Sequence, residues 1–546
     1  MAVRVNLDAM IKREDLDLTD KDPAQITIGS QLKLYELEQT SASFHILRKP
    51  DFQRETSNWD PEKIAGIIIS FLDGDLIPSI IVWRSSKSGK LFVIDGAHRL
   101  SALIAWINSD YGDGPISRAF FSNVIDDNQL KAAKKTRDLV DAKVGSYQDL
   151  KGYVIKPEGS PDPETLLRAR NGSALSITLQ DVKGDVARAE KSFLKINQSA
   201  TPIDPTELII IEARRKANAI AARALLRAGT GHPYWGAFSD DRKEKITKLS
   251  SEIYEHLFQP ILQYPIRTLS LPAAGHSVTP DSLDLIFNLV NHVNDAFDSS
   301  KKKNEARWKV TIAGADIDLE DDEDGEMTIG FLTKVLDTSS RVFGPATGSL
   351  ALHPGVYCYG ATGRFQPTAF FAAIDLVKYL EIHRKFDAFT ESRSKFEEFL
   401  MRYRFFINQI VGSYGSQLKG LPALNKMYQI ILSEIIKGRD DASVVNKIAS
   451  DGELSFIRDI TDDDRKYGRN FSKETRSAIY LREALAKELT CGICNSRLHS
   501  KSITIDHKQR KQDGGVGSPD NGQLAHPYCN NGFKEKMVHA SATSGT

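Results

Sequence analysis

Two pairs of potential metal ligands near the end of the sequence constrain its fold most strongly. Cys491 and Cys494 are separated by two residues, and His526 and Cys529 repeat that spacing further along. A turn of this length directs both side chains of a pair at one ion, and four thiolate or imidazole ligands form the closed tetrahedral site typical of structural Zn²⁺. A segment of about 50–60 residues is too short for a large apolar core. We therefore expect zinc to stabilise a small module at 491–546.

Further polar residues with chemical potential lie between and just after these pairs. Residues 502–506 alternate polar and apolar side chains, as a half-buried strand does, and a glycine-rich loop follows. Asp506 and His507 then fall on opposite faces of the strand. A carboxylate with a nearby amide can hold Mg²⁺, while a separate histidine can take a proton from water that attacks a phosphodiester. These residues predict metal-assisted phosphodiester hydrolysis.

The pattern as a whole resembles the HNH, or ββα-metal, endonucleases. The segments that carry the resemblance are Cys491-Gly-Ile-Cys494, Ile505-Asp506-His507, Asn521 and His526-Pro-Tyr-Cys529-Asn530. The resemblance implies that His507 is the general base and that Asp506 and Asn530 hold a catalytic Mg²⁺ or Mn²⁺. It also implies that Asn521 positions the loop of His507. Many members have cysteine at position 526, so the zinc ligands here would be Cys₃His.

Two simpler readings share the ligand spacing. The first is a structural zinc module without catalysis, and the second is a coincidence of three cysteines. Coincidence is disfavoured because both pairs have ligand spacing and an Asp-His step and an asparagine fall between them.

Composition and charge restrict the class of protein. The 546 residues leave room for three or four domains, and 72 Lys and Arg balance 72 Asp and Glu, so bulk charge gives no argument for nucleic acid. Residues 491–546 contain seven Lys or Arg and four Asp or Glu, a balance of +3 that suits phosphate contacts. The fourth cysteine, Cys358, is expected to be a buried small hydrophobe. Few cysteines, no signal-peptide pattern and no membrane-length apolar run predict a cytoplasmic protein without membrane contact.

A strand, a glycine turn and a helix are predicted in the N-terminal part. Asp60-Pro61 begins a helix that ends at Gly74. Residues 79–83 and 90–94 form a hairpin, and Asp95-Gly96 leads from its second strand into another helix. Backbone N–H groups at such a helix start bind phosphate, and Asp95, His98 and Arg99 could assist as metal ligand, acid or base, and anion contact. The alternative is a plain turn in which His98 and Arg99 only cap and form salt bridges.

This part resembles the DGQQR/DGQHR-motif domains of the ParB/sulfiredoxin-like superfamily, which form the N-terminal half of GmrSD-type modification-dependent restriction enzymes and of the defence nuclease SspE. The segments that carry the resemblance, over about residues 30–215, are Pro50–Arg54, Trp59, Ile77-Pro78, Val93–Leu100 and Phe193–Leu208. It implies that GTP or ATP is bound, or hydrolysed, by Gln53, Arg54, Asp95, Gly96, His98, Arg99 and Asn197. Ala97 stands where the family usually has glutamine. This difference concerns whether the nucleotide is hydrolysed and which nucleotide base is preferred. The chain has no GxxxxGK[ST] segment, which excludes an ordinary P-loop ATPase.

From residue 205 to about 460 the apolar residues follow helix periodicity, for example over 207–226. The fold class that follows is a multidomain α+β protein. Its expected parts are a ParB/sulfiredoxin-like domain at 1–210, a mostly helical domain at 211–460, a linker with a lead-in helix at 461–490, and a zinc-stapled ββα-metal domain at 491–546.

These expectations combine into an anti-phage or restriction-type DNA endonuclease that nicks or cuts with Mg²⁺ and is gated by its N-terminal domain. Its partners would be DNA, modified or from phage, a nucleotide, and either a second copy or a partner protein. The alternative is a nucleotide-dependent DNA-binding regulator with a non-catalytic zinc module. A third reading is a sulfiredoxin-type kinase that transfers phosphate at Asp95 and Arg99.

Overall fold

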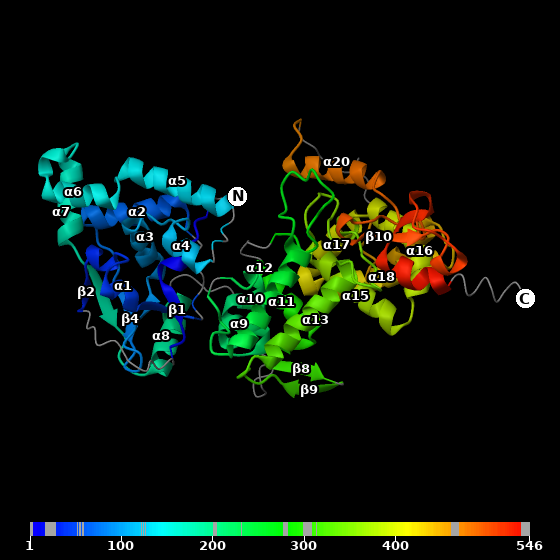
Figure 1. The fold of residues 1–546 in the computed structure, drawn as a ribbon, viewed down its shortest axis with the longest axis horizontal. Coiled ribbons are helices and arrows are strands. Elements are labelled where there is room, and N and C mark those ends of the chain that lie inside the picture. Colours follow the sequence, from blue (N-terminus) through cyan, green and yellow to red (C-terminus); the bar gives the residue numbers. More distant parts are fainter. Residues whose placement is uncertain are drawn as a thin grey trace, which may run out of the picture. The chain divides into compact units, whose positions relative to one another are not determined.

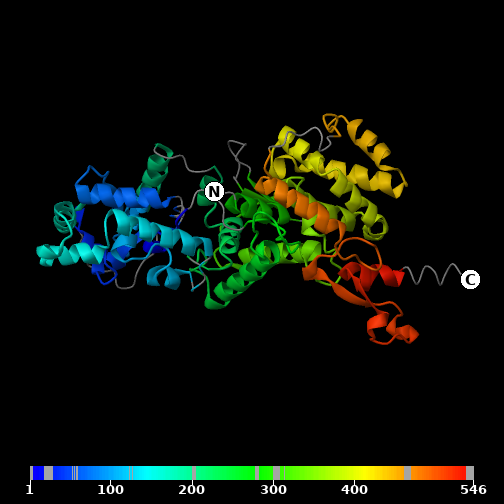
Figure 2. The same cartoon turned by 90° about the horizontal axis from the view of Figure 1, so that it is seen from above.

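The computed structural model describes residues 4–16, 29–51, 53, 56, 59–121, 123, 125, 127–199, 205–230, 232–276, 282–298, 308–312, 314–459 and 469–536. The chain divides into two compact units (Figure 1, Figure 2). The first comprises Met1–Arg214 with Thr230–Gly236, and the second comprises Arg215–Gly229 with Ala237–Thr546.

The N-terminal unit contains a six-stranded mixed sheet in the order β1-β3-β5-β4-β6-β2. The β1–β3, β3–β5 and β4–β6 pairs are parallel, whereas β5–β4 and β6–β2 are antiparallel. The strands are β1 (Lys12–Glu14), β2 (Gln31–Leu32), β3 (Leu47–Pro50), β4 (Ile80–Arg84), β5 (Leu91–Asp95) and β6 (Ile177–Asp181). The helices are α1 (Ala42–Ile46), α2 (Pro61–Asp73), α3 (Ala97–Ile107), α4 (Pro115–Phe120), α5 (Asp127–Lys143), α6 (Tyr147–Ile155), α7 (Pro163–Ala174), α8 (Val186–Ser199) and α9 (Pro205–Glu212).

Strand β5 lies between two apolar cores. Leu91 and Val93 belong to the larger core, which includes residues of α2 and α3. Phe92 and Ile94 belong to the smaller core, which includes Phe193 of α8. Since alternate side chains of a strand point to opposite faces, the sheet is covered on both sides. The buried strand therefore fixes the position of the turn that follows it.

The predicted local elements of this unit are confirmed. Helix α2 begins after Asp60, whose Oδ1 accepts a hydrogen bond of 2.9 Å from the Lys63 N–H, and its C-cap is Gly74 with φ of 79°. β4 and β5 form the antiparallel pair, one residue further along than predicted. Helix α3 starts after Gly96, where φ is 92° and a Cβ would lie 2.5 Å from Ile80 Cδ1, so only glycine fits.

The second unit is mostly helical in its described part. Its helices are α10 (Ala217–Leu226), α11 (Asp240–Phe258), α12 (Ser282–Val293), α13 (Glu326–Phe343), α14 (Pro354–Tyr357), α15 (Pro367–Ile382), α16 (Phe386–Arg402), α17 (Phe405–Tyr414), α18 (Leu421–Ile436), α19 (Asp441–Ala449) and α20 (Lys473–Ala486). A small antiparallel sheet of β7 (Ala296–Asp298), β8 (Trp308–Ile312) and β9 (Ala315–Asp318) also occurs. The second unit ends with β10 (Thr504–His507), β11 (Gly522–Ala525) and the π-helical turn η9 (Cys529–Phe533).

The single helix predicted over 207–226 is wrong. The chain leaves the helix after α9 and starts α10 at Ala217. Lys216 between them has extended backbone, forms an isolated β-bridge with Asp321, and donates from Nζ to the Leu319 carbonyl at 2.7 Å. These long-range contacts override the local helix periodicity.

None of the helices in the described ranges combines the length and apolarity needed to cross a bilayer.

A buried ionic cluster supports the edge of the N-terminal sheet. Asp8 Oδ1 accepts hydrogen bonds of 2.7 Å from both Arg13 Nη2 and Lys49 Nζ, and all three side chains are at most 5% exposed. Asp8 Oδ1 also accepts from the Thr56 N–H at 2.9 Å. Burial alone would raise the pKa of Asp8, but Arg13 and Lys49 outweigh it, and the pKa lies well below the ordinary value. The cluster joins β1 and β3 to the segment that follows them.

We predict that Asp8→Asn lowers the free energy of unfolding by about 3–5 kcal/mol, because both cations lose a buried carboxylate. Since the folded pKa is depressed, the wild-type contribution is full above about pH 4 and is lost as pH falls further. Asp73→Asn, which breaks the more exposed Arg168 pair, should cost at most about 1 kcal/mol. Denaturant unfolding at pH 7 and pH 3 measures both, and equal losses for the two variants would contradict the prediction.

Candidate functional site

The two predicted ligand pairs come together in one cluster. Ligand atoms of Cys491, Cys494, His526 and Cys529 all lie within 4.8 Å of one another, and all four residues are buried. His526 Nδ1 is 3.4 Å from Cys494 Sγ and 3.8 Å from Cys529 Sγ. Tetrahedral Zn²⁺ with bonds of about 2.3 Å separates its sulfur ligands by about 3.8 Å. The four residues therefore fit a structural zinc ion.

The surrounding backbone orients these ligands. His526 Nε2 lies 3.0 Å from the carbonyl of Arg497, a contact that places the ring proton on Nε2 and leaves Nδ1 free for metal. Burial, with Arg393 next, lowers the pKa of His526, which favours the neutral, metal-binding ring. The Ile493 N–H donates to Cys491 Sγ at 3.4 Å, and Asn495 takes a positive φ of 58° to close the turn.

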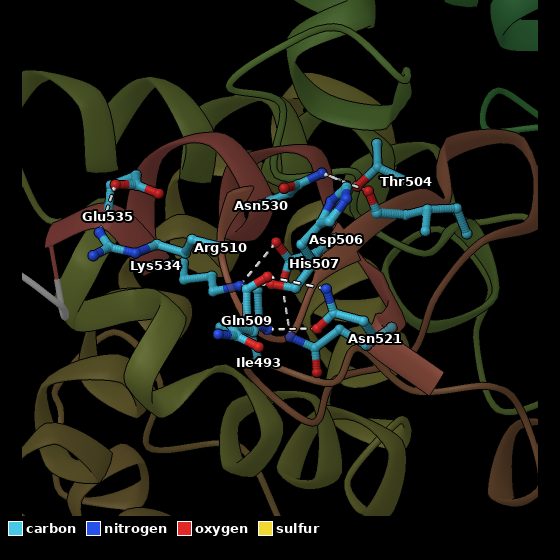
Figure 3. Close-up of polar contacts among 12 residues, drawn as sticks. Ile493, Thr504, Asp506, His507, Gln509, Arg510, Asn521, Asn530, Lys534 and Glu535 are labelled. Carbon is cyan, nitrogen blue, oxygen red and sulfur yellow. Dashed lines mark hydrogen bonds and ion pairs between the residues drawn. The ribbon is translucent and has the colours of Figure 1, made fainter. Parts of the chain in front are cut away.

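A ββα arrangement follows the first cysteine pair, as predicted. β10 pairs antiparallel with β11, with Asp506 opposite Gln523 and His507 opposite Gly522. The π-helical turn η9 carries Asn530 and leads into a short helix. The four residues expected to act on the substrate therefore lie on β10, directly before β11, and on η9 (Figure 3).

Asn521 fixes the loop that follows His507. Its Nδ2 donates to the carbonyls of Gln509 at 3.1 Å and Val516 at 2.8 Å, while its Oδ1 accepts from the Gln509 N–H at 2.7 Å (Figure 3). The Lys508 N–H donates to the Asn521 carbonyl at 2.7 Å. One asparagine thus connects both ends of the loop, which is the arrangement that a residue positioning the His507 loop requires.

Asp506 and His507 differ in exposure, as alternation along a strand requires. Asp506 is 5% exposed, whereas His507 is partly exposed. In the described part of the chain no hydrogen bond to the His507 ring is found. A partly exposed imidazole is suited to exchange a proton with water.

Both oxygens of Asp506 are hydrogen-bonded. Lys534 Nζ lies 2.8 Å from Oδ2 and 3.1 Å from Oδ1, and Gln523 Nε2 donates to Oδ2 at 2.6 Å. Gln523 also packs over the zinc-binding turn, where a Cβ on Gly492 would lie 2.5 Å from its Oε1. Gln523 therefore connects the zinc-binding turn to Asp506.

Asn530 lies next to β10, where its side chain contacts Thr504 and Ile505. Its Nδ2 is 3.3 Å from both Thr504 Oγ1 and the Ile505 carbonyl (Figure 3), so its Oδ1 is oriented away from them. A carboxylate and an amide oxygen are donors that Mg²⁺ and Mn²⁺ prefer. Asp506 and Asn530 thus fit such an ion in chemical type, with Lys534 as the neighbouring cation.

Side chains of the helical region anchor the zinc-binding part. The Arg497 N–H donates to Glu397 Oε2 at 3.2 Å. Tyr528 donates from its N–H to the Ser349 carbonyl at 3.0 Å and from its hydroxyl to Asp387 Oδ1 at 2.6 Å. Residues 491–536 are therefore packed within the second unit.

The predicted phosphate-binding turn of the N-terminal unit has its expected backbone, but its charged residues pair with each other. Arg99 Nη2 donates to Asp95 Oδ2 at 2.9 Å, and Arg99 Nη1 donates to the carbonyl of Pro78. The His98 ring lies 5.6 Å from the Trp59 ring. Gly96 provides the left-handed turn at the start of α3. This geometry therefore agrees with the alternative in which Arg99 forms a salt bridge at a plain turn.

Gln53 is 8% exposed, and its Oε1 is buried with no hydrogen-bond partner among the described residues. This acceptor is available for a hydrogen bond from a ligand or from water. Arg54 lies outside the described residues. Asn197 lies on α8, but its side chain is outside them.

Sequence reasoning missed several residues at both sites. They are Gln523 and Lys534 next to Asp506, and Asp8, Arg13 and Lys49 near Gln53. Lys534 follows Asn530 by four residues, so the helical spacing of Asn530 and Lys534 was a usable signal. Lys49 directly precedes the Pro50–Arg54 segment, whereas nothing local marks Asp8 or Arg13.

Comparison with known families agrees with both resemblances. Residues 33–211 match the model of the GmrSD restriction endonuclease N-terminal domain, and residues 491–535 match that of HNH endonucleases. The predicted fusion of these two regions in one chain is thus confirmed. Neither the curated proteins nor the solved structures contain a match.

We predict that the purified chain binds about one zinc ion and that Cys494→Ser loses most of it, because three ligands leave the tetrahedral site open. Cys358→Ala is the control, since Cys358 is also a buried cysteine but lies outside the cluster. Metal content by mass spectrometry and thermal unfolding of each variant check this. Equal zinc content in the wild type and Cys494→Ser would contradict it.

Proposed function

We propose that this protein is a restriction-type DNA endonuclease whose C-terminal region cuts a phosphodiester bond. The observation that carries the proposal is the loop of His507, which Asn521 holds beside the Cys₃His cluster in a region that matches HNH endonucleases. The balance of +3 over residues 491–546 would favour contact with the DNA backbone.

In the proposed reaction, water attacks the phosphorus, its proton passes to the His507 ring, and the P–O3′ bond breaks. Asp506 and Asn530 would hold Mg²⁺ or Mn²⁺, which stabilises charge on the phosphate and the leaving oxygen when bound. Asn521 keeps the His507 loop in place and Gln523 orients the Asp506 carboxylate. The partly exposed ring of His507 allows substrate access.

We further propose that the N-terminal region is a ParB/sulfiredoxin-like sensor that binds GTP or ATP, recognises a DNA modification, or does both. The orphaned Oε1 of Gln53 and the glycine turn before α3 support a ligand there. The proposed parts are a sensor at 1–210, a helical relay at 211–460, a linker at 461–490 and a nuclease part at 491–546. The protein would act in the cytoplasm, on phage or modified DNA.

The anchoring contacts of Arg497 and Tyr528 affect how gating can be tested. They join the nuclease part to the helical region, so an excised C-terminal segment would lose buried partners. Gating is therefore tested on the full chain.

We predict that His507→Ala reduces plasmid cleavage in Mg²⁺ or Mn²⁺ by about 10²–10⁴-fold, because the attacking water loses its base. His383→Ala, which changes an exposed histidine of the helical region, is the matched control. Wild type and both variants are run on unmodified and modified DNA, with equal zinc content verified first. Equal cleavage by wild type and His507→Ala in every condition would instead favour the DNA-binding regulator.

We predict that Gln53→Ala weakens binding of GTP or ATP by about tenfold, the effect of losing one buried hydrogen bond to a ligand. Gln180→Ala, an exposed glutamine of the same unit, should leave binding unchanged. A fluorescent nucleotide titration measures both, and cleavage by the full chain with and without nucleotide shows whether binding gates the cut. Equal affinities of wild type and Gln53→Ala would contradict a role of Gln53 in nucleotide binding.

A further inference from the structure

The ammonium group of Lys534 is fully engaged at the centre of the C-terminal site. It lies 2.8 Å and 3.1 Å from the two oxygens of Asp506 and also contacts the carbonyl of His507 (Figure 3). Three acceptors satisfy the three N–H donors of a lysine. Lys534 therefore contacts both the expected metal ligand and the backbone of the expected base.

This ion pair is largely withdrawn from solvent. The Lys534 side chain is 14% exposed and that of Asp506 is 6% exposed. Attraction between opposite charges strengthens as water is excluded, so this pair is stronger than the usual surface salt bridge. The Gln523 amide holds the same carboxylate from a third direction.

The neighbouring cations have other partners. Lys508 Nζ donates to the Asp520 carbonyl, and Arg510 pairs with Asp513 and Glu535. Among the described lysines and arginines, Lys534 is the one in contact with Asp506. The charge next to this carboxylate is thus assigned to a single side chain.

We infer that Lys534 is the resident counter-ion of Asp506 and that a divalent cation occupies this carboxylate by displacing the ammonium. The inference rests on the proposed function only in expecting such an ion at Asp506 and Asn530. Two cations at one carboxylate repel each other, and a divalent ion attracts the carboxylate more strongly than an ammonium does. Lys534 therefore lowers the affinity of the site for metal and sets the ion concentration at which it fills.

The first test is Mn²⁺ binding to the zinc-loaded full chain without DNA, followed by electron paramagnetic resonance of the free ion. Lys534→Met, which keeps length but removes charge, should bind Mn²⁺ at least about fivefold more tightly. Lys534→Arg should stay near wild type. Lys511→Met removes an equal charge from an exposed position in the loop between β10 and β11 and should change little. Asp506→Asn should lose this binding.

Unchanged or weaker Mn²⁺ affinity in Lys534→Met, at wild-type zinc content, would overturn the inference, as would unchanged affinity in Asp506→Asn. A second measurement on the wild type does not depend on how the variant folds. Labelling of lysine amines, mapped by mass spectrometry, should increase at Lys534 when Mn²⁺ is added and stay constant at Lys511. Constant labelling at Lys534 under Mn²⁺ saturation would also overturn it.

These measurements separate the inference from the proposed nuclease function. Tighter Mn²⁺ binding in Lys534→Met without any DNA cleavage by the wild type would support the role of Lys534 and contradict the proposed endonuclease function. DNA cleavage that requires His507, together with a Mn²⁺ affinity that does not depend on Lys534, would support the endonuclease function and contradict the proposed role of Lys534.

Discussion

The position of the zinc-binding turn in the second unit depends on the ion pair between Arg393 and Glu397. Both side chains are at most 1% exposed, and Arg393 Nε donates to Glu397 Oε1 at 2.7 Å. Arg393 also donates to the Leu350 carbonyl at 2.6 Å, while Glu397 accepts from the Tyr357 hydroxyl and from the Arg497 N–H. A buried charge is tolerated only with such complete partners, so the pair fixes α16, the segment before α14 and the zinc-binding turn relative to one another.

The zinc-binding part has little else to hold it. Apart from the three cysteines, the buried members of its own apolar core are Leu498 and Ala525. Three thiolates and one Zn²⁺ leave a net charge of −1. Burial would lower the pKa of Arg393, but the neighbouring Glu397, Tyr357 and Cys494 outweigh it and raise the pKa above its ordinary value. The helical region thus supplies hydrogen bonds as well as packing. The domain boundary predicted at residue 491 marks the first residue of the Cys₃His cluster, whereas the compact second unit includes residues on both sides of it.

Local signals allowed much of the fold and site to be predicted, because short-range geometry determines them. The Cys-x-x-Cys spacing brings two sulfurs together in one cluster, Asp60-Pro61 starts a helix, and the Asp95-Gly96 turn needs a positive φ that glycine supplies. Contacts between distant segments were missed for the opposite reason. Gln523 reaches Asp506 through the β10–β11 pairing, and Lys216 leaves the predicted helix where it pairs with Asp321 and contacts Leu319.

Asp95 and Asp506, the two carboxylates expected to serve as ligands, share a property that the sequence does not reveal. Each of them pairs with a cation. Asp95 and Arg99 are four residues apart at the start of α3, and Asp95 is 34% exposed, so water can replace either partner at small cost. Asp506 and Lys534 come from β10 and the segment after η9, and burial makes an unpaired charge there expensive. At Asp506, only a cation can replace Lys534 without leaving the carboxylate uncompensated, and a divalent ion meets that condition.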